Sequence, residues 1–339
     1  MGKLTILIPG LFGPFQGVTK EDVPRFPALE SLLAKAGRKR RIGSTFYTSL
    51  CHLFGLEKFP GQDLPVAALT RLLDDQERPE GIWTRIDPVH LSAGREGLTL
   101  MDATLFTLSQ HDAIILGAPL KQLFAGQGWM FEIPVAKRWY LRVKEHPEIT
   151  TTEINEAAGR SVQPLMPAGA GQMGWARLLN EAQMLLHDSE VNREREKRGE
   201  LTINSLWLWG IGQLPEILPR KWSMLISDDP VAQGLAMLSG TPFTSLQIDA
   251  EEIIHGADNT GEVLIVIVTA QAHSSYGDFC AWRRELEDLE HHWFTPIVKA
   301  LEEDRMKQLT ILTNNNEFTC TRRTLLKFWR RQRRLLDYE

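Results

Sequence analysis

Short apolar runs, each bounded by glycine, proline or asparagine, recur along this chain of 339 residues. Such runs are typical of strands that are buried on both faces, as in a parallel sheet. Stretches with helical spacing of apolar residues lie between them. This alternation predicts an α/β fold with a doubly wound, mostly parallel sheet. The predicted strands are Leu4–Pro9, Ala113–Leu116, Leu206–Trp209, Ser223–Ile226, Val263–Val268 and Leu309–Leu312.

Three segments carry the apolar stripe of a helix. The first runs from Trp175 to Leu186. The second starts after Asp229, a good N-cap, with Pro230 at the first helical position, and ends near Gly240. The third covers residues 282–297, and Pro296 is expected to kink it.

The middle of the chain differs from both ends because it is rich in proline and glycine. Strands are expected around Ile82–Asp87 and Trp139–Val143, and the charge run at 191–200 is expected to be solvated. We therefore predict an inserted α+β domain over residues 61–202, with residues 1–60 and 203–339 forming the α/β core.

Composition narrows the class of protein. The chain is 43% hydrophobic and 24% charged, with a formal net charge of −5, as in an ordinary globular protein, and nucleic acid is not an expected partner. Cys51, Cys280 and Cys320 lack zinc-ligand or redox spacing. No apolar run approaches the roughly 20 residues that span a membrane, and the first residues lack a signal-peptide pattern. We expect a reduced, cytoplasmic protein without a membrane span.

Polar residues follow two of the predicted strands. "VTAQAHSSYGDF" (268–279) supplies Gln271, His273 and Ser275, and "LTILTNNNEF" (309–318) supplies Asn315 and Asn316. Ligands of open α/β sheets bind at the carboxyl ends of the strands. The Gly-rich segment 7–15 after the first strand has no nucleotide-binding motif and is expected to be a tight turn.

Other candidate groups are open to two interpretations. Asp87 and His90 could form a metal or acid/base pair, or could make buried hydrogen bonds. Residues 246–262 concentrate acids and His255 in no known ligand pattern, which favours a solvated loop. His291 and His292 are adjacent, so at most one of them can face a given site on a helix.

The C-terminal segment 321–339 is predicted to be an amphipathic basic helix. Such a helix either packs on the sheet with a solvated face or contacts an acidic partner, such as a membrane surface, nucleic acid or a phosphate. Its expected contact residues are Arg330, Arg331, Arg333 and Arg334.

Several segments in order resemble a known family. "EAQMLLHDSEVNREREKRGELTINSLWLWGIG" (181–212) is similar to the archaeal-type cofactor-independent phosphoglycerate mutases, and more closely to their bacterial relatives, the RpfE-type regulatory proteins. The resemblance extends over most of the chain, through residues 50–75, 87–100, 227–240 and 277–301. It implies an alkaline-phosphatase-like core in which two divalent metals and a nucleophilic serine transfer a phosphoryl group.

The resemblance also implies that the ligand positions are substituted. An aspartate after the first strand is replaced by Pro9, and an Asp/His set is replaced by Gln271 and Ser275. The final Asp-His pair is replaced by Asn315 and Asn316. Neutral amides and hydroxyls do not by themselves build a binuclear metal site, so no cofactor is expected. For the nucleophile, Ser44 and Ser49 are the nearest candidates, and neither aligns cleanly.

Three hypotheses follow from this comparison. The first is a non-catalytic regulatory protein that binds a small anionic ligand at helix N-termini, or a protein partner. The second is an active phosphomutase or phosphohydrolase with displaced ligands such as Asp87, His90, His255 or His273. The third is an interaction module that uses the basic C-terminal helix.

Overall fold

The computed structural model describes residues 2–13, 15, 17–41, 45–94, 97–247, 249–256 and 261–339, and the side chains of 255 and 256 are not included in that description. The chain divides into two compact units. Unit 1 contains residues 1–56 and 218–339, and unit 2 contains residues 57–217. In the described part of the chain, no helix has the length and apolar character needed to cross a bilayer.

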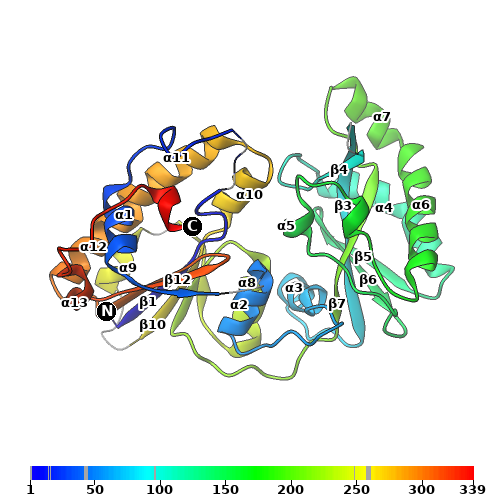
Figure 1. Ribbon diagram of the computed structural model, residues 1–339. Helices are drawn as coiled ribbons and strands as arrows, with labels where there is room; N and C mark the ends of the chain where they lie inside the picture. Colours follow the sequence, from blue (N-terminus) through cyan, green and yellow to red (C-terminus); the bar gives the residue numbers. More distant parts are fainter. Residues whose placement is uncertain are drawn as a thin grey trace. The chain divides into compact units, whose positions relative to one another are not determined.

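Unit 1 is built on a seven-stranded sheet in the order β2-β12-β11-β1-β10-β8-β9 (Figure 1). Five neighbouring strands are parallel, and two antiparallel strands extend one edge. The fold is thus mixed α/β with a mostly parallel sheet, as the sequence predicted. Its strands are β1 (Lys3–Leu7), β2 (Gly37–Arg40), β8 (Met224–Ile226), β9 (Phe243–Thr244), β10 (Glu262–Val266), β11 (Gln308–Leu312) and β12 (Asn316–Cys320).

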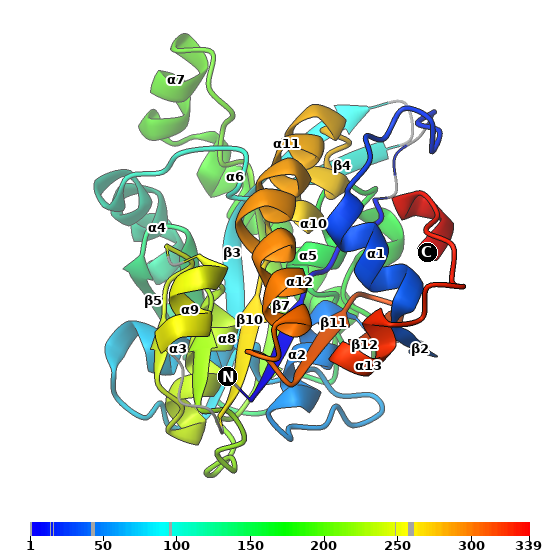
Figure 2. The same cartoon turned by 90° about the vertical axis from the view of Figure 1, so that its left-hand side faces the viewer.

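The central strands are apolar at almost every position because helices cover the sheet. Alternate residues such as Ile6, Ile265 and Ile311 join one core with the helices α1, α11 and α12, which lie over one face of the sheet (Figure 2). The helices of this unit are α1 (Pro27–Lys35), α2 (Phe46–Leu53), α8 (Pro230–Ser239), α9 (Ala250–Gly256), α10 (Thr269–Ser275), α11 (Phe279–Leu289), α12 (Thr295–Glu302) and α13 (Arg322–Leu325).

Helix starts and stops follow the expected chemistry in α8. The Asp229 side chain accepts a hydrogen bond from the Ala232 N–H at 2.8 Å, Pro230 opens the helix, and Gly240 ends it in a left-handed conformation. The third predicted helix is interrupted as expected, but by a π-helical turn at Glu290–Phe294 just before Pro296. Glu290 in this turn accepts hydrogen bonds from the Ala28 and Leu29 N–H groups at the start of α1.

Unit 2 is built on an antiparallel sheet in the order β4-β3-β6-β5, with β7 paired to β3. Helices α4 and α6 pack on it and share its apolar core. Its strands are β3 (Ile82–Gly94), β4 (Gly97–Met101), β5 (Met130–Val135), β6 (Arg138–Val143) and β7 (Ser205–Gly212). Its helices are α3 (Val66–Asp75), α4 (Gln110–Ala125), α5 (Ile154–Ala157), α6 (Gln172–His187) and α7 (Glu190–Lys197).

Three sequence-based assignments are corrected by the structure. Residues 113–116 lie inside α4 because the Ser109 side chain caps this helix and the apolar run faces the core only at some positions. The strand at 206–209 exists, but it pairs antiparallel with β3 in unit 2 and does not belong to the parallel sheet. Unit 2, at residues 57–217, includes this strand as well as the residues 61–202 predicted for the inserted domain.

The third correction concerns the C-terminus, where the predicted continuous helix is absent from the described residues. Only Arg322–Leu325 is α-helical, and residues 326–334 form turns and irregular chain. The reason is that Arg330 and Arg334 donate hydrogen bonds to backbone carbonyls of the first 36 residues, which holds the segment extended against the unit. Leu335 and Tyr338 are buried there.

Candidate functional site

The carboxyl ends of the parallel strands in unit 1 bring together the segments after β1, β10 and β11. The chain leaves β1 through buried Pro9 and Gly10. Gly10 has a φ of +73°, and a Cβ atom there would lie 2.6 Å from the Cα of Gln271. Glycine is therefore required both by the backbone conformation and by the close approach of the two chains.

Two side chains fix this turn. The Gly10 N–H donates to Oδ1 of Asn314, at 3.2 Å, and the Gly10 carbonyl accepts from Nε1 of Trp282, at 3.0 Å. Asn314 follows β11 and Trp282 is fully buried on α11. The strand ends are thus joined by neutral hydrogen bonds and a backbone contact.

Of the positions where the resemblance implies substituted metal ligands, only some lie close together. Pro9 and Gln271 flank the Gly10 contact, but Ser275 lies at the far end of α10. Asn315 lies in the turn between β11 and β12, and Asn316 is the first residue of β12. Oδ1 of Asn316 accepts a hydrogen bond from Nε of Arg38 at 2.9 Å, so this buried amide serves the β2 edge of the sheet.

An open pocket of about 330 Å³ lies at the ends of β8 and β10 in the same unit. Four carboxylates line it, together with one imidazole and an apolar floor that includes Ile267 and Trp293. Among the described side chains, no three of His, Cys, Asp or Glu lie close enough to hold a metal ion. The titratable lining residues are Asp228, Asp249, Glu285, Asp288 and His292.

The electrostatics of this pocket favour a cationic or neutral ligand. Carboxylates on several walls repel an anion. The N-terminus of α8, which follows the lining residue Asp228, could attract an anion but is already capped by the Asp229 side chain. The small anionic ligand expected from the sequence therefore has little electrostatic support at this pocket.

Sequence reasoning located parts of this pocket without recognising it. His292 lines the pocket and His291 is exposed elsewhere on the same turn, as the adjacency rule predicted. Asp249 belongs to a segment predicted to be a solvated loop, and Asp228 directly precedes the predicted N-cap Asp229. Ser44, Arg95, Glu96 and Asp258 lie outside the described residues, as does the His255 side chain.

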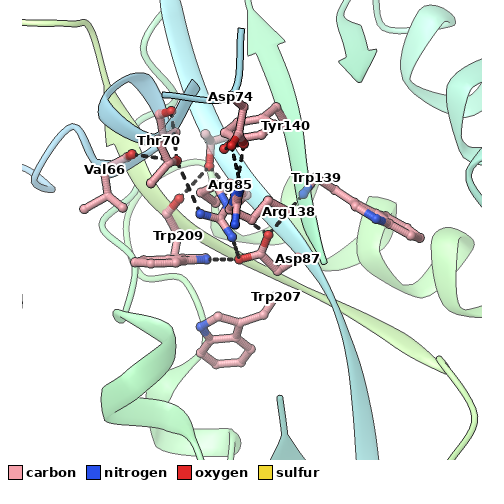
Figure 3. A network of polar contacts seen from close by, with 12 residues as sticks. Val66, Thr70, Asp74, Arg85, Asp87, Arg138, Trp139, Tyr140, Trp207 and Trp209 are labelled. Atoms are coloured by element: carbon pink, nitrogen blue, oxygen red, sulfur yellow. Dashed lines mark hydrogen bonds and ion pairs between the residues drawn. The ribbon is translucent and has the colours of Figure 1, made fainter. Parts of the chain in front are cut away.

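Asp87, a candidate catalytic residue, is bound within a buried network of unit 2 (Figure 3). Its Oδ1 accepts from Nε of Arg85 at 2.9 Å and from the Trp139 N–H at 3.2 Å. Its Oδ2 accepts from Nε1 of Trp209 at 2.7 Å and pairs with the Arg85 guanidinium at 2.8 Å. Because a carboxylate has about four acceptor sites, Asp87 has no capacity left for a substrate or metal.

The network continues around Tyr140 (Figure 3). Its hydroxyl donates to Asp74 at 2.6 Å, and Arg138 makes two further hydrogen bonds to that carboxylate. Burial raises the pKa of Tyr140 well above its usual value, so the hydroxyl stays protonated and remains a donor. These contacts indicate a structural role.

The two histidines named with Asp87 make contacts of their own within their units. His90 lies further along β3, and its Nδ1 makes a 2.8 Å hydrogen bond with the Thr202 carbonyl. His273 is in unit 1, half-buried on α10, and its own carbonyl accepts from the Asp278 N–H. The structure therefore does not pair His90 with Asp87 as the sequence allowed.

Comparison with known proteins gives relatives of one kind. No family model matches the chain. The chain is 25% identical over 196 residues to a probable 2,3-bisphosphoglycerate-independent phosphoglycerate mutase of Geobacter sulfurreducens, covering 56% of this chain and 48% of the relative. It is 23% identical over 147 residues to the 2,3-bisphosphoglycerate-independent phosphoglycerate mutase of Methanosarcina barkeri, covering 41% and 37%. The chain thus spans about half or less of these curated relatives.

One solved structure extends the similarity to the fold. A protein from Pyrococcus horikoshii matches with a TM-score of 0.52 at 12% identity, over 94% of this chain and 87% of that chain. The cofactor-independent phosphoglycerate mutase from Thermoplasma acidophilum matches with a TM-score of 0.48 at 18% identity, over 94% and 89%. The chain is therefore similar to cofactor-independent phosphoglycerate mutases in sequence, and its α/β fold is shared with a solved protein.

Proposed function

We propose that this protein is a phosphoglycerate mutase-like binding protein that no longer performs phosphoryl transfer, akin to the RpfE-type regulatory proteins. One observation carries the proposal. The strand-end turn at Gly10 is closed by the Asn314 amide and packed against the Gln271 backbone, at the place where the resemblance puts metal ligands.

The donor set at this turn does not fit a pair of divalent metals. Pro9 has no side-chain donor atom, and the Asn314 oxygen is already hydrogen-bonded to the Gly10 N–H. Two dications close together need several carboxylates or imidazoles to offset their charge, and single amides do not supply it. The residues at this turn therefore do not support phosphoryl transfer through a pair of bound metals.

The ligand class follows from the neighbouring pocket. Its carboxylate lining favours a cationic or neutral small molecule. A ligand in this pocket would contact α11 and the π-helical turn. Glu290 in that turn accepts hydrogen bonds from backbone N–H groups at the start of α1. A ligand that shifts this turn would thus affect α1 as well, which is a route for regulation.

The test combines metal content with activity. The purified full chain, loaded with Mn²⁺ and dialysed, should retain fewer than two equivalents of divalent metal. It should also fail to interconvert 2- and 3-phosphoglycerate when Mn²⁺, Co²⁺ or Mg²⁺ is added. Two tightly held equivalents together with metal-dependent turnover would overturn the proposal.

A further inference from the structure

The residues after α13 form a turn that exposes two aromatic rings. The Arg330 N–H donates to the Lys327 carbonyl at 3.1 Å, which places Phe328 and Trp329 at the two central positions of the turn. The side chains of Phe328 and Trp329 are 87% and 66% exposed, and neighbouring Leu326 is 69% exposed. We call residues 326–330 the aromatic turn. Adjacent exposed apolar residues of this size are unusual on a protein surface and indicate a contact site.

Positive charge surrounds this turn. Residues 321–339 contain seven arginines and lysines against two carboxylates, and residues 37–41 contain four against none. These two segments therefore carry a net charge of +9, and the rest of the chain carries −14, given the total of −5. Such asymmetry within one chain points to an anionic partner for this surface.

The two basic segments are neighbours in unit 1, beside each other in Figure 2. The Arg330 guanidinium donates to the Ala36 carbonyl at 2.6 Å, and that of Arg38 donates to the Glu339 carbonyl at 2.7 Å. Arg334 donates to the Lys20 and Val23 carbonyls. Arg330 and Arg334 thus hold the segment in place, and exposed Arg331 and Arg333 are left to face a partner.

We propose that the aromatic turn and the adjoining basic residues bind the surface of an anionic lipid bilayer. Tryptophan and phenylalanine rings enter the headgroup region readily, and nearby arginines are attracted to anionic lipids. A projecting turn can bury both rings in a soft interface, whereas a folded protein would need a pocket of matching shape. The site is separate from the strand-end pocket and is independent of the proposed ligand.

Vesicle sedimentation tests this inference with the full chain. Vesicles of phosphatidylcholine with phosphatidylserine should bind the protein, and vesicles of phosphatidylcholine alone should bind it much less. Raising the salt concentration should weaken binding because it screens the charges. Arg331→Gln combined with Arg333→Gln should weaken it about 25-fold, at roughly fivefold for each arginine near the surface. Phe328→Ala combined with Trp329→Ala should weaken it by at least about tenfold.

Matched controls come from exposed residues of unit 2. Met173→Ala with Met184→Ala removes exposed apolar side chains, and Arg177→Gln with Lys197→Gln removes exposed charges. Both control variants should bind vesicles as the parent protein does, and all variants should keep its circular dichroism spectrum.

Three results would overturn the proposal. They are equal binding to neutral and anionic vesicles, equal losses in test and control variants, and binding to single-stranded RNA or to an acidic protein surface with none to anionic vesicles.

Discussion

The two units place their polar residues in opposite ways. In unit 2, Arg85 and Asp87 are almost fully buried, and the carboxylate is surrounded by donors. In unit 1, the carboxylates of the strand-end pocket lie on an open surface, and the adjoining turn at Gly10 is closed by neutral groups. Residues that look catalytic in a sequence can thus be structural when their partners are complete, so the function must be sought where groups face solvent.

Removing Asp87 should cause the largest loss, because it would leave the buried Arg85 guanidinium without its counter-charge. Asp87→Ala is expected to lower the free energy of unfolding by roughly 3–5 kcal/mol, measured by urea denaturation followed by tryptophan fluorescence. Asp188→Ala, at an exposed position of the same unit, should change it by no more than about 0.5 kcal/mol. Similar values for both variants would show that the network is not structural.

The turn at Gly10 is expected to be nearly as sensitive. Gly10→Ala adds a left-handed strain of roughly 1–2 kcal/mol and an overlap with the Gln271 backbone that costs roughly 1–3 kcal/mol more. Gly277→Ala has a similar φ of +68° but nothing within 4 Å, so it should show the strain alone. If the two variants unfold at the same urea concentration, Gly10 does not pack closely against the Gln271 backbone.

Asn314 should contribute less than Gly10. Asn314→Ala removes the acceptor of the Gly10 N–H and should cost about 1 kcal/mol. The adjacent Asn315→Ala alters an exposed side chain and should cost less than about 0.5 kcal/mol. A greater loss of unfolding free energy in Asn315→Ala than in Asn314→Ala would contradict the hydrogen bond between Asn314 and Gly10.

The cysteines provide the mildest test, because labelling the parent chain requires no substitution. Burial raises the pKa of the Cys320 thiol to about 12, whereas Cys280 is exposed. Iodoacetamide should therefore label Cys280 and spare Cys51 and Cys320 in the folded chain. Since the unfolded thiol titrates near pH 9, the stability linked to Cys320 is present below that pH and is lost as pH rises toward 12. Cys320→Ala should flatten this alkaline decline, and rapid native labelling of Cys320 would contradict the burial.

Much of unit 1 could be predicted from sequence, and less of unit 2. Runs such as 263–268 are apolar at every position, which only a covered strand tolerates, and Asp229-Pro230 is a strong helix start. The run at 113–116 is too short to distinguish a strand from a helix, and the capping by Ser109 decided it. The pairing of β7 with β3 depends on contacts between residues far apart in the sequence. The local pattern of apolar residues does not encode such contacts.

The site was harder to predict for the same reason. The sequence located the strand-end positions. Only the fold shows that the Gly10 N–H donates to Asn314, whereas Asn316 bonds Arg38. The basic C-terminus had the right composition for a helix, yet hydrogen bonds from Arg330 and Arg334 to distant carbonyls hold it extended. Such tertiary hydrogen bonds override local propensity.

The central claim is that the strand ends after β1, β10 and β11 no longer hold two metals. The most direct measurement is anomalous X-ray scattering from crystals of the full chain soaked in Mn²⁺. We predict no pair of manganese peaks beside Pro9, Gln271 and Asn314. Two strong peaks there, a few ångströms apart and coordinated by side chains of this unit, would contradict the account.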